Sequence, residues 1–177
     1  NRVRAVSASN TCGLVMHDND LIDSGEGQSN GAIHLVNVCL SEEEARLSLY
    51  DNTFGEENTS GTSALQVITA NGLTISNDSN PEADIILNDM GTVTYPIRLV
   101  AMQGGLLDKI DLSHAGAQDG IALRLQNSFD FTVELVLMQN RHTAVQLIGG
   151  QRNEFLDLDM TGTGLNDDRS VLLLEGV

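Results

Sequence analysis

The sequence predicts an all-β fold, a solenoid of about eight coils in which each coil contributes short parallel strands. One apolar segment returns four times, and its equivalent residues Ile97, Ile121, Val145 and Val171 follow one another at intervals of 24, 24 and 26 residues. Segments rich in Gly, Asn and Asp separate the copies. No segment has apolar residues at the 3.6-residue period of a long helix. A strand that returns at a nearly fixed interval is typical of a solenoid.

A second, shorter strand is expected between the copies, in residues 110–112, 133–137 and 155–160. Apolar and polar residues alternate there, so one side of each strand packs in a core and the other meets water. In the first strand of each coil, the same reasoning predicts one inward ladder of stacked leucines: Leu99, Leu123, Leu147 and Leu173.

The N-terminal half is predicted to continue the solenoid with larger insertions, so that residues 1–177 form one domain. Ser41 suits the N-cap of one short helical turn near Glu42. The polar segments 51–62 and 77–82 predict loops that project from the stacked coils of the solenoid. The strands expected in this half are residues 13–16, 32–36, 63–68 and 72–77.

Residues 119–128, followed at once by an apolar segment at 131–138, resemble the generic repeat of the right-handed parallel β-helix, or pectin-lyase-like, superfamily. The resemblance is clearest over residues 84–177. It implies the fold of that superfamily. Because lyases, hydrolases, phage tailspikes and adhesins share the repeat, the resemblance specifies the function much less closely.

Composition restricts the partners. The chain is 41% apolar but only 3% aromatic, so the core must be built from stacked Leu, Ile and Val. With 25 acidic and 9 basic residues, the formal net charge is −16, which repels the phosphates of nucleic acids and of anionic membranes. No run of eighteen apolar residues occurs, so no membrane insertion is expected. These features agree with a secreted or cell-surface protein.

The two cysteines, Cys12 and Cys39, lie near strands of neighbouring predicted coils. They form either one disulfide that joins the N-terminal coils or two buried thiols that act as small apolar residues. The sequence leaves both alternatives open. Neither cysteine belongs to a Cys-x-x-Cys pair, which argues against a zinc site or thioredoxin-type chemistry.

Two kinds of enzyme use the fold that the resemblance implies. Its polysaccharide lyases cut uronic acid chains with acidic calcium ligands beside an Arg or Lys base, and its hydrolases use paired Asp residues. The hydrolase pattern is present only as scattered fragments, at residues 51–53, 113–116 and 167–168. For contact with a polysaccharide, the outward positions of the strands suggest four candidates: Arg98, Arg124, Glu134 and Asp157.

Residues 17–27 form the segment that is richest in acidic residues and also contains glycine. Calcium takes six or more oxygen ligands, and Asp18, Asp20 and Asp23 are the candidates to supply them. The segment has neither the spacing of an EF-hand loop nor that of a calcium β-roll, so an ordinary surface turn is the competing interpretation. No other cofactor is predicted.

The first and last residues of the sequence are typical of β-strands, and no polar or helical cap accompanies them. This predicts end-to-end self-association, or continuation of the same chain into a longer solenoid. We therefore expect a non-catalytic structural or adhesive segment with polysaccharide contact. The alternative is a polysaccharide lyase or glycoside hydrolase of the pectin-lyase-like fold.

Overall fold

The computed structural model describes residues 6–17, 19–21, 33–39, 46–50, 53–54, 63–76, 95–113, 118–164 and 171–176. These residues form strands and turns without any helix, which confirms the all-β prediction for them. The helical turn expected near Glu42 lies outside the described residues. The strands are β1 (Val6–Ser9), β2 (Gly13–His17), β3 (Asp20–Leu21), β4 (Ile33–Val38), β5 (Arg46–Tyr50), β6 (Thr53–Phe54), β7 (Ser63–Ser76), β8 (Tyr95–Asp108), β9 (Gln118–Glu134), β10 (Arg141–Gln151), β11 (Glu154–Leu156) and β12 (Leu172–Glu175).

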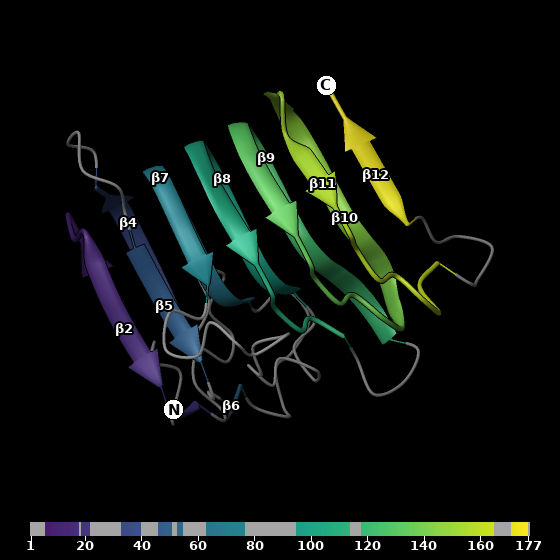
Figure 1. Ribbon diagram of the computed structural model, residues 1–177, viewed down its shortest axis with the longest axis horizontal. Coiled ribbons are helices and arrows are strands. Elements are labelled where there is room, and N and C mark those ends of the chain that lie inside the picture. The colour runs from purple at the N-terminus through teal and green to yellow at the C-terminus, as the bar shows by residue number, and fades with distance from the viewer. Residues whose placement is uncertain are drawn as a thin grey trace.

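The strands form one large parallel sheet in the order β1-β4-β7-β8-β9-β10-β12, and β2, β5 and β11 join it beside this path. Figure 1 shows β4, β7, β8, β9, β10 and β12 side by side in the order of the sequence. A small separate sheet pairs β3 with β6, and β6 lies within residues 51–62, which the sequence predicts as a loop. Parallel pairing of successive strands is compatible with a β-helix-like fold. The predicted count of about eight coils stays a prediction.

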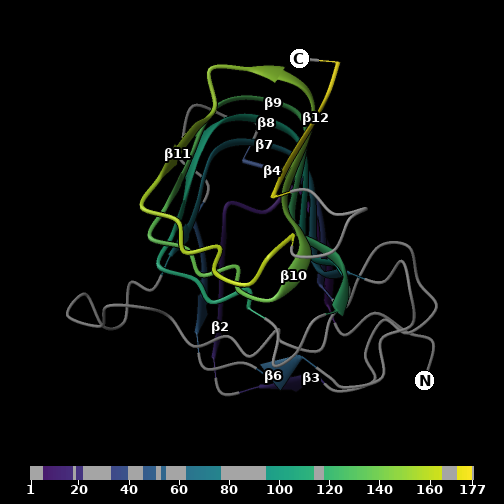
Figure 2. The same ribbon diagram turned by 90° about the vertical axis from the view of Figure 1, so that its right-hand side faces the viewer.

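The long strands β7, β8, β9 and β10 bend, and Figure 2 shows their arched course around the interior. Left-handed backbone conformations mark the bends, at Ala101 and Gly104 in β8 and at Asn127 and Asp130 in β9. We call the first side the sheet of β1, β4, β12 and the first halves of the long strands. The second side is formed by β2, β5, β11 and the second halves of β7, β8 and β9.

Apolar ladders, meaning residues paired in register across successive strands, fill the space between the two sides. Every member of the central ladders is at most 8% exposed, so the predicted core of stacked Leu, Ile and Val is confirmed. Vertical stacking of like side chains suits parallel strands, which lie ~4.8 Å apart. On the first side the two ladders are Ile33-Leu65-Ile97-Leu123-Val145 and Leu35-Val67-Leu99-Leu125-Leu147.

The predicted register is wrong at the second copy of the apolar segment. Ile97 pairs with Leu123 and not with Ile121, so Leu123 belongs to the ladder beside that of Leu99. A slip of two residues keeps the same face of a strand inward, so alternation alone does not reveal it. The repeat is also less regular than predicted, since 26 residues separate Ile97 from Leu123 and 22 separate Leu123 from Val145.

At the last copy the register differs by one residue. Val145 pairs with Leu172 and not with Val171, and Leu173 pairs with Gln146. A slip of one residue exchanges the two faces of a strand. The prediction that Leu173 continues the inward leucine ladder is therefore wrong, and Leu174 takes that place.

Gly105 explains how one aromatic ring enters the narrow core. It pairs with Phe131, whose side chain is fully buried. A Cβ atom at Gly105 would lie 2.4 Å from the carbonyl oxygen of Leu73 and 2.8 Å from the Phe131 ring. The backbone there also has φ +138°, which glycine adopts readily. Glycine is thus required at the bend that precedes the second side of β8.

Candidate functional site

The outward face of the first side presents two arginines in register. Arg98 in β8 pairs with Arg124 in β9, and Gln66 and Gln146 continue the row on the strands before and after. We call these four residues the arginine row. Burial lowers the pKa of Arg98, and the neighbouring positive charge of Arg124 lowers it further. An Nη2 donor of Arg98 lies 3.5 Å from Oε1 of Gln126.

In the arginine row, Nε of Arg124 and Oε1 of Gln146 are buried without a hydrogen-bond partner in the described part of the chain. Gln146 as a whole is only 8% exposed, although its position is on the outward face of the sheet. Buried polar atoms are usually hydrogen-bonded. This pair therefore offers one donor and one acceptor at adjacent positions.

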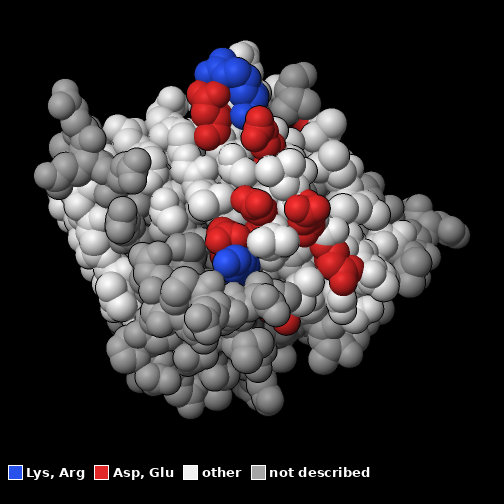
Figure 3. Space-filling view, in the orientation of Figure 1, with Lys and Arg blue, Asp and Glu red and all other residues white. Residues whose placement is uncertain are grey.

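The second side has the opposite charge. Glu134 at the end of β9 pairs with Asp108 on the previous strand and with Leu156 on the next. Figure 3 shows acidic side chains gathered over this side of the molecule. Partial burial raises the pKa of Asp108, and the nearby Lys109 offsets part of that rise.

The four predicted polysaccharide contacts are therefore not brought together. Arg98 and Arg124 lie on the first side, and Glu134 lies on the second side, beyond the bend that contains Asn127 and Asp130. Asp157 is exposed and has φ 50° at a turn after β11, so it is not on a strand. A composite site of arginines beside carboxylates is not assembled from these residues.

The calcium prediction falls largely beyond what the structure describes. Asp18 and Asp23 lie outside the described residues, and Asp20 begins β3, where its backbone pairs with Thr53. Within the described ranges, no group of three or more His, Cys, Asp or Glu residues is placed to hold a metal ion. The described segments also contain no helix long and apolar enough to cross a membrane.

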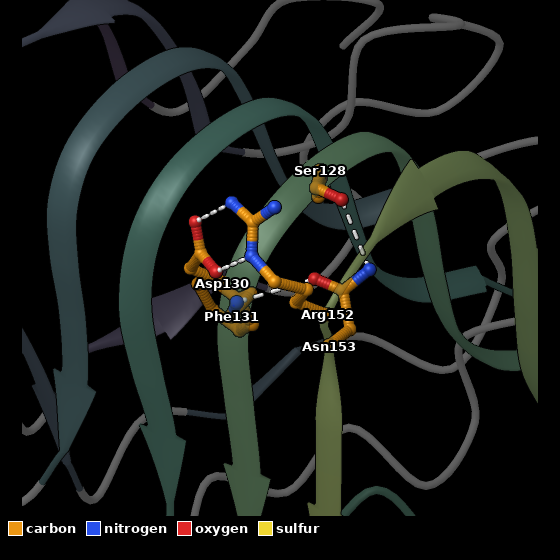
Figure 4. Close-up of polar contacts among 5 residues, drawn as sticks. All are labelled: Ser128, Asp130, Phe131, Arg152 and Asn153. Atoms are coloured by element: carbon orange, nitrogen blue, oxygen red, sulfur yellow. Dashed lines mark hydrogen bonds and ion pairs between the residues drawn. The ribbon is translucent and has the colours of Figure 1, made fainter.

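The polar side chains that do come together join neighbouring strands. Asn153, just before β11, donates from Nδ2 to the carbonyl oxygen of Ser128 at 2.9 Å, and its Oδ1 accepts from the backbone N–H of Phe131 at 3.2 Å. Figure 4 shows this contact at the bend of β9. The hydroxyl of buried Ser128 in turn accepts from the N–H of Met102 at 3.4 Å. A chain of hydrogen bonds thus crosses three successive layers.

Arg152 forms a two-pronged ion pair with Asp130 at the same bend, with Nε 2.5 Å from Oδ1 and Nη2 2.6 Å from Oδ2 (Figure 4). Both side chains are more than half exposed, which limits the contribution of the pair to stability. The hydrogen bond from Arg152 nevertheless lowers the pKa of Asp130. Both residues have positive φ, so the pair joins the left-handed positions of two adjacent bends.

Arg141 is a fully buried cation at the start of β10. Its Nε donates to the carbonyl oxygen of Leu112 at 2.7 Å, and Nη2 donates to that of Ser113 at 3.3 Å. Burial lowers its pKa to about 10, although the charge of Asp111 acts in the opposite direction. The guanidinium therefore supplies donors to backbone carbonyls of an earlier layer.

Carboxylates at the ends of the second side also form hydrogen bonds within the protein. Oδ1 of Asp111 accepts from the N–H of Ser113 at 2.9 Å, and Oδ1 of Asp159 accepts from the N–H of Thr161 at 3.0 Å. Oδ2 of Asp159 also accepts from Nε2 of Gln139 at 2.6 Å. The hydroxyl of Thr161 donates to Oδ1 of Asp159 at 2.6 Å, and this hydrogen bond, together with those from the Thr161 N–H and from Gln139, lowers the pKa of Asp159. Two of the outward carboxylates are thus used to fix turns.

No sequence pattern predicts the roles of Asn153, Arg152 and Arg141. The available signal was weak, because Gly149 and Gly150 occupy the positions that Asn127 and Ser128 hold one layer earlier. Gly-Gly opposite Asn-Ser indicates close approach of two bends, but it does not specify which side chains bond across them.

Cys12 and Cys39 form a disulfide, which decides between the two alternatives that the sequence left open. Their Cα atoms are 4.6 Å apart. The N–H of Cys39 also donates to the carbonyl oxygen of Thr11 at 3.0 Å. The bond links the turn after β1 to the end of β4, and closing a loop of this length contributes about 3–4 kcal/mol on the chain-entropy model.

The chain matches no protein-family model, no curated protein and no solved structure.

Proposed function

We propose that the chain is a segment of a right-handed parallel β-helix of the pectin-lyase-like type, and that its role is structural or adhesive. The parallel pairing of successive strands and the bends of the long strands support the first part. The main support for the second part is how the polar side chains are used. Asn153, Arg152, Arg141 and Asp159 bond to backbone or side chains of neighbouring layers or turns.

Such contacts suit a protein that must keep its shape. Hydrogen bonds between layers fix the relative positions of those layers, which apolar contacts alone do not. Each hydrogen bond contributes about 0.5–1.5 kcal/mol to the free energy of unfolding. The acidic second side keeps a strand-rich molecule soluble. The Cys12–Cys39 disulfide supports a secreted or cell-surface location, because disulfides persist mainly in oxidising compartments.

The test combines an assay for catalysis with a measurement of stability. The chain is incubated with a panel of polyuronates while the absorbance of unsaturated products is followed, and reducing ends are measured to detect hydrolysis. We expect neither product, together with cooperative thermal unfolding at high temperature. Turnover of any polyuronate would overturn the non-catalytic role and favour the lyase or hydrolase alternative.

A second candidate function is direct contact with an anionic polysaccharide along the arginine row. The observation in its favour is the pair of buried atoms without partners, Nε of Arg124 and Oε1 of Gln146. A guanidinium donor suits a carboxylate or sulfate, and an amide oxygen suits a sugar hydroxyl. No calcium bridge is needed in this mode, since the carboxylates of the second side take no part.

Binding of polygalacturonate, measured by calorimetry against neutral dextran, tests this candidate. Arg124→Gln is expected to weaken binding about ten-fold or more, because a hydrogen bond to a charged group contributes about 1.5–3 kcal/mol. Arg152→Gln is the matched control, since Arg152 is exposed at the bend beyond the first side. Equal loss in both variants, or binding that requires calcium, would contradict direct contact through the arginine row.

A further inference from the structure

The bend between the two sides carries one aromatic ring that is not part of the core. Of the three phenylalanines whose side chains the structure describes, Phe131 is fully buried and Phe155 packs against the core. Phe129 is half-buried and lies outside that core cluster. An aromatic ring has a large apolar surface that favours contact with another apolar surface. The ring of Phe129 therefore keeps surface that is available for a ligand.

Phe129 stands in an in-register row with an amide side chain one layer away on either side. It pairs with Gln103 of β8 and with Gln151 of β10, and both glutamines are exposed. Paired positions of neighbouring strands lie ~4.8 Å apart. Each amide offers two donors and one acceptor oxygen, and a hydroxyl group likewise donates and accepts. The ring is thus bordered on both sides by groups that suit hydroxyls.

Asp130, the next residue in the chain, adds a charged acceptor in a fixed position. Arg152 donates to both of its carboxylate oxygens, at 2.5 and 2.6 Å, while 51% of the Asp130 side chain stays exposed. A carboxylate oxygen has two lone pairs, so each can accept a further hydrogen bond. The corresponding position of β8 is Gly104, where even a Cβ atom would meet nothing closer than 4.0 Å. The preceding layer thus places no side chain there.

The backbone that carries Phe129 and Asp130 is fixed from the next layer. Asn153 donates to the carbonyl oxygen of Ser128 and accepts from the N–H of Phe131, so its two hydrogen bonds bracket these residues (Figure 4). A site that is already ordered loses less conformational freedom when a ligand binds. The bend therefore holds the ring and the carboxylate in one arrangement before any contact is made.

The charges at this bend favour a neutral ligand. Asp130 and Arg152 pair with each other, and the groups beside them are two amides and a phenyl ring. The chain as a whole has a formal net charge of −16, which repels anionic glycans. An uncharged ligand meets no such repulsion and leaves the ion pair intact.

We propose that this bend binds a neutral pyranose sugar through four residues, which we call the bend site: Gln103, Phe129, Asp130 and Gln151. A pyranose such as β-galactose has one face of C–H groups, which packs on the phenyl ring, and hydroxyls at its edge for the amides and the carboxylate. Arg152 only holds the carboxylate in place. The inference rests on the proposed adhesive role and adds the class of ligand and the contact residues.

Ligand-detected NMR of the full chain with methyl β-D-galactopyranoside tests the bend site. We expect saturable binding by the wild type, with a Kd that does not change with salt because the sugar is uncharged. Phe129→Leu should weaken binding about ten-fold, because leucine keeps an apolar side chain but lacks the flat face. Phe155→Leu is the matched control, since it makes the same change in a ring that packs against the core, and it should leave the Kd unchanged.

A second measurement uses the absence of tryptophan from the sequence. Phe129→Trp keeps a flat aromatic surface at the bend and adds a single fluorescent reporter. We expect this variant to bind the sugar at least as tightly as the wild type, with a shift in its emission on titration. Phe155→Trp places the reporter against the core, and its emission should not respond. Circular dichroism checks that each variant is folded.

Three results would overturn the bend site. They are a wild type that does not bind the sugar, a Kd that Phe129→Leu leaves unchanged, and an equal loss in Phe155→Leu. Sugar binding that weakens with added salt and does not depend on Phe129 would overturn it too, and would favour contact along the arginine row. The proposed structural role is tested separately, by turnover and unfolding, so it survives each of these results.

Discussion

The two sides of the molecule share one core but present opposite chemistry outward. On the first side, Arg98 and Arg124 stack in a row with glutamines before and after them. On the second side, Asp108 and Glu134 stack in the corresponding way. The bends between the sides are fixed by positive φ and by side chains such as Asn153 that bond from layer to layer.

This difference shows which residues determine the fold and which are available for contacts. Apolar ladders and bends are alike in successive layers, because each strand must pair with the next. Outward positions have no such requirement, so their charge differs from side to side. Arg98 and Arg124 therefore lie on a different side from Asp108 and Glu134, and an account that combines these four residues in one site does not fit the strand register.

The largest effect is expected when a carboxylate is placed at an inward position of a strand and compared with the same carboxylate at the neighbouring outward position. Leu123→Asp places a charge in a fully buried ladder, and we expect a loss of about 4–5 kcal/mol or more in the free energy of unfolding. Arg124→Asp, one residue further on the outward row, should leave the fold nearly unchanged. Urea unfolding followed by circular dichroism measures both, and similar losses would contradict the assignment of the two faces.

A smaller effect is expected at the bend that separates the sides. Gly105→Ala brings a Cβ atom against the carbonyl oxygen of Leu73, and overpacking of this kind costs about 1–3 kcal/mol. Gly104→Ala is the matched control, because its Cβ atom would meet nothing closer than 4.0 Å and only the positive φ is strained. Thermal unfolding compares the two, and a larger loss for Gly104→Ala would refute the close approach at Gly105.

Asn153→Ala removes two hydrogen bonds between layers at the bend of β9. We expect a loss of about 1–2 kcal/mol in the free energy of unfolding and faster hydrogen exchange at the amide of Phe131. The nearby exposed Gln151 gives the control variant Gln151→Ala, which should change neither quantity. Unchanged exchange at Phe131 in Asn153→Ala would argue against this contact.

The smallest effect concerns pH. The hydrogen bond from Arg152 lowers the folded-state pKa of Asp130 below its unfolded value. Its stabilising contribution is therefore complete above the unfolded pKa and is lost as the pH falls through the folded one, below about pH 4. The melting temperature of Asp130→Asn should thus fall less steeply on acidification than that of the wild type. A steeper fall would contradict the sign of the shift.

The sequence was sufficient for the all-β class, the apolar ladders and most strands, because alternation and turn residues are local signals. It was insufficient for the register. The two-residue slip at Ile121 leaves every inward residue inward, and the connections between layers vary in length. It was also insufficient to predict the contacts of Asn153 and Arg141. The hydrogen-bond partners of these residues lie in earlier layers, so they can be identified only when the register is known.

The most direct test of this account is a disulfide that only the described register allows. Glu134 pairs with Leu156, so cysteines at these two positions have Cα atoms ~4.8 Å apart, within the range that a disulfide spans. Glu154 lies on the same face of β11 but two residues away, at about 8 Å, beyond that range. On mild oxidation, followed by peptide mapping, Glu134→Cys with Leu156→Cys should form the new disulfide within one chain, and Glu134→Cys with Glu154→Cys should not. Preferential bridging of the second pair would contradict the stacked register on which the account depends.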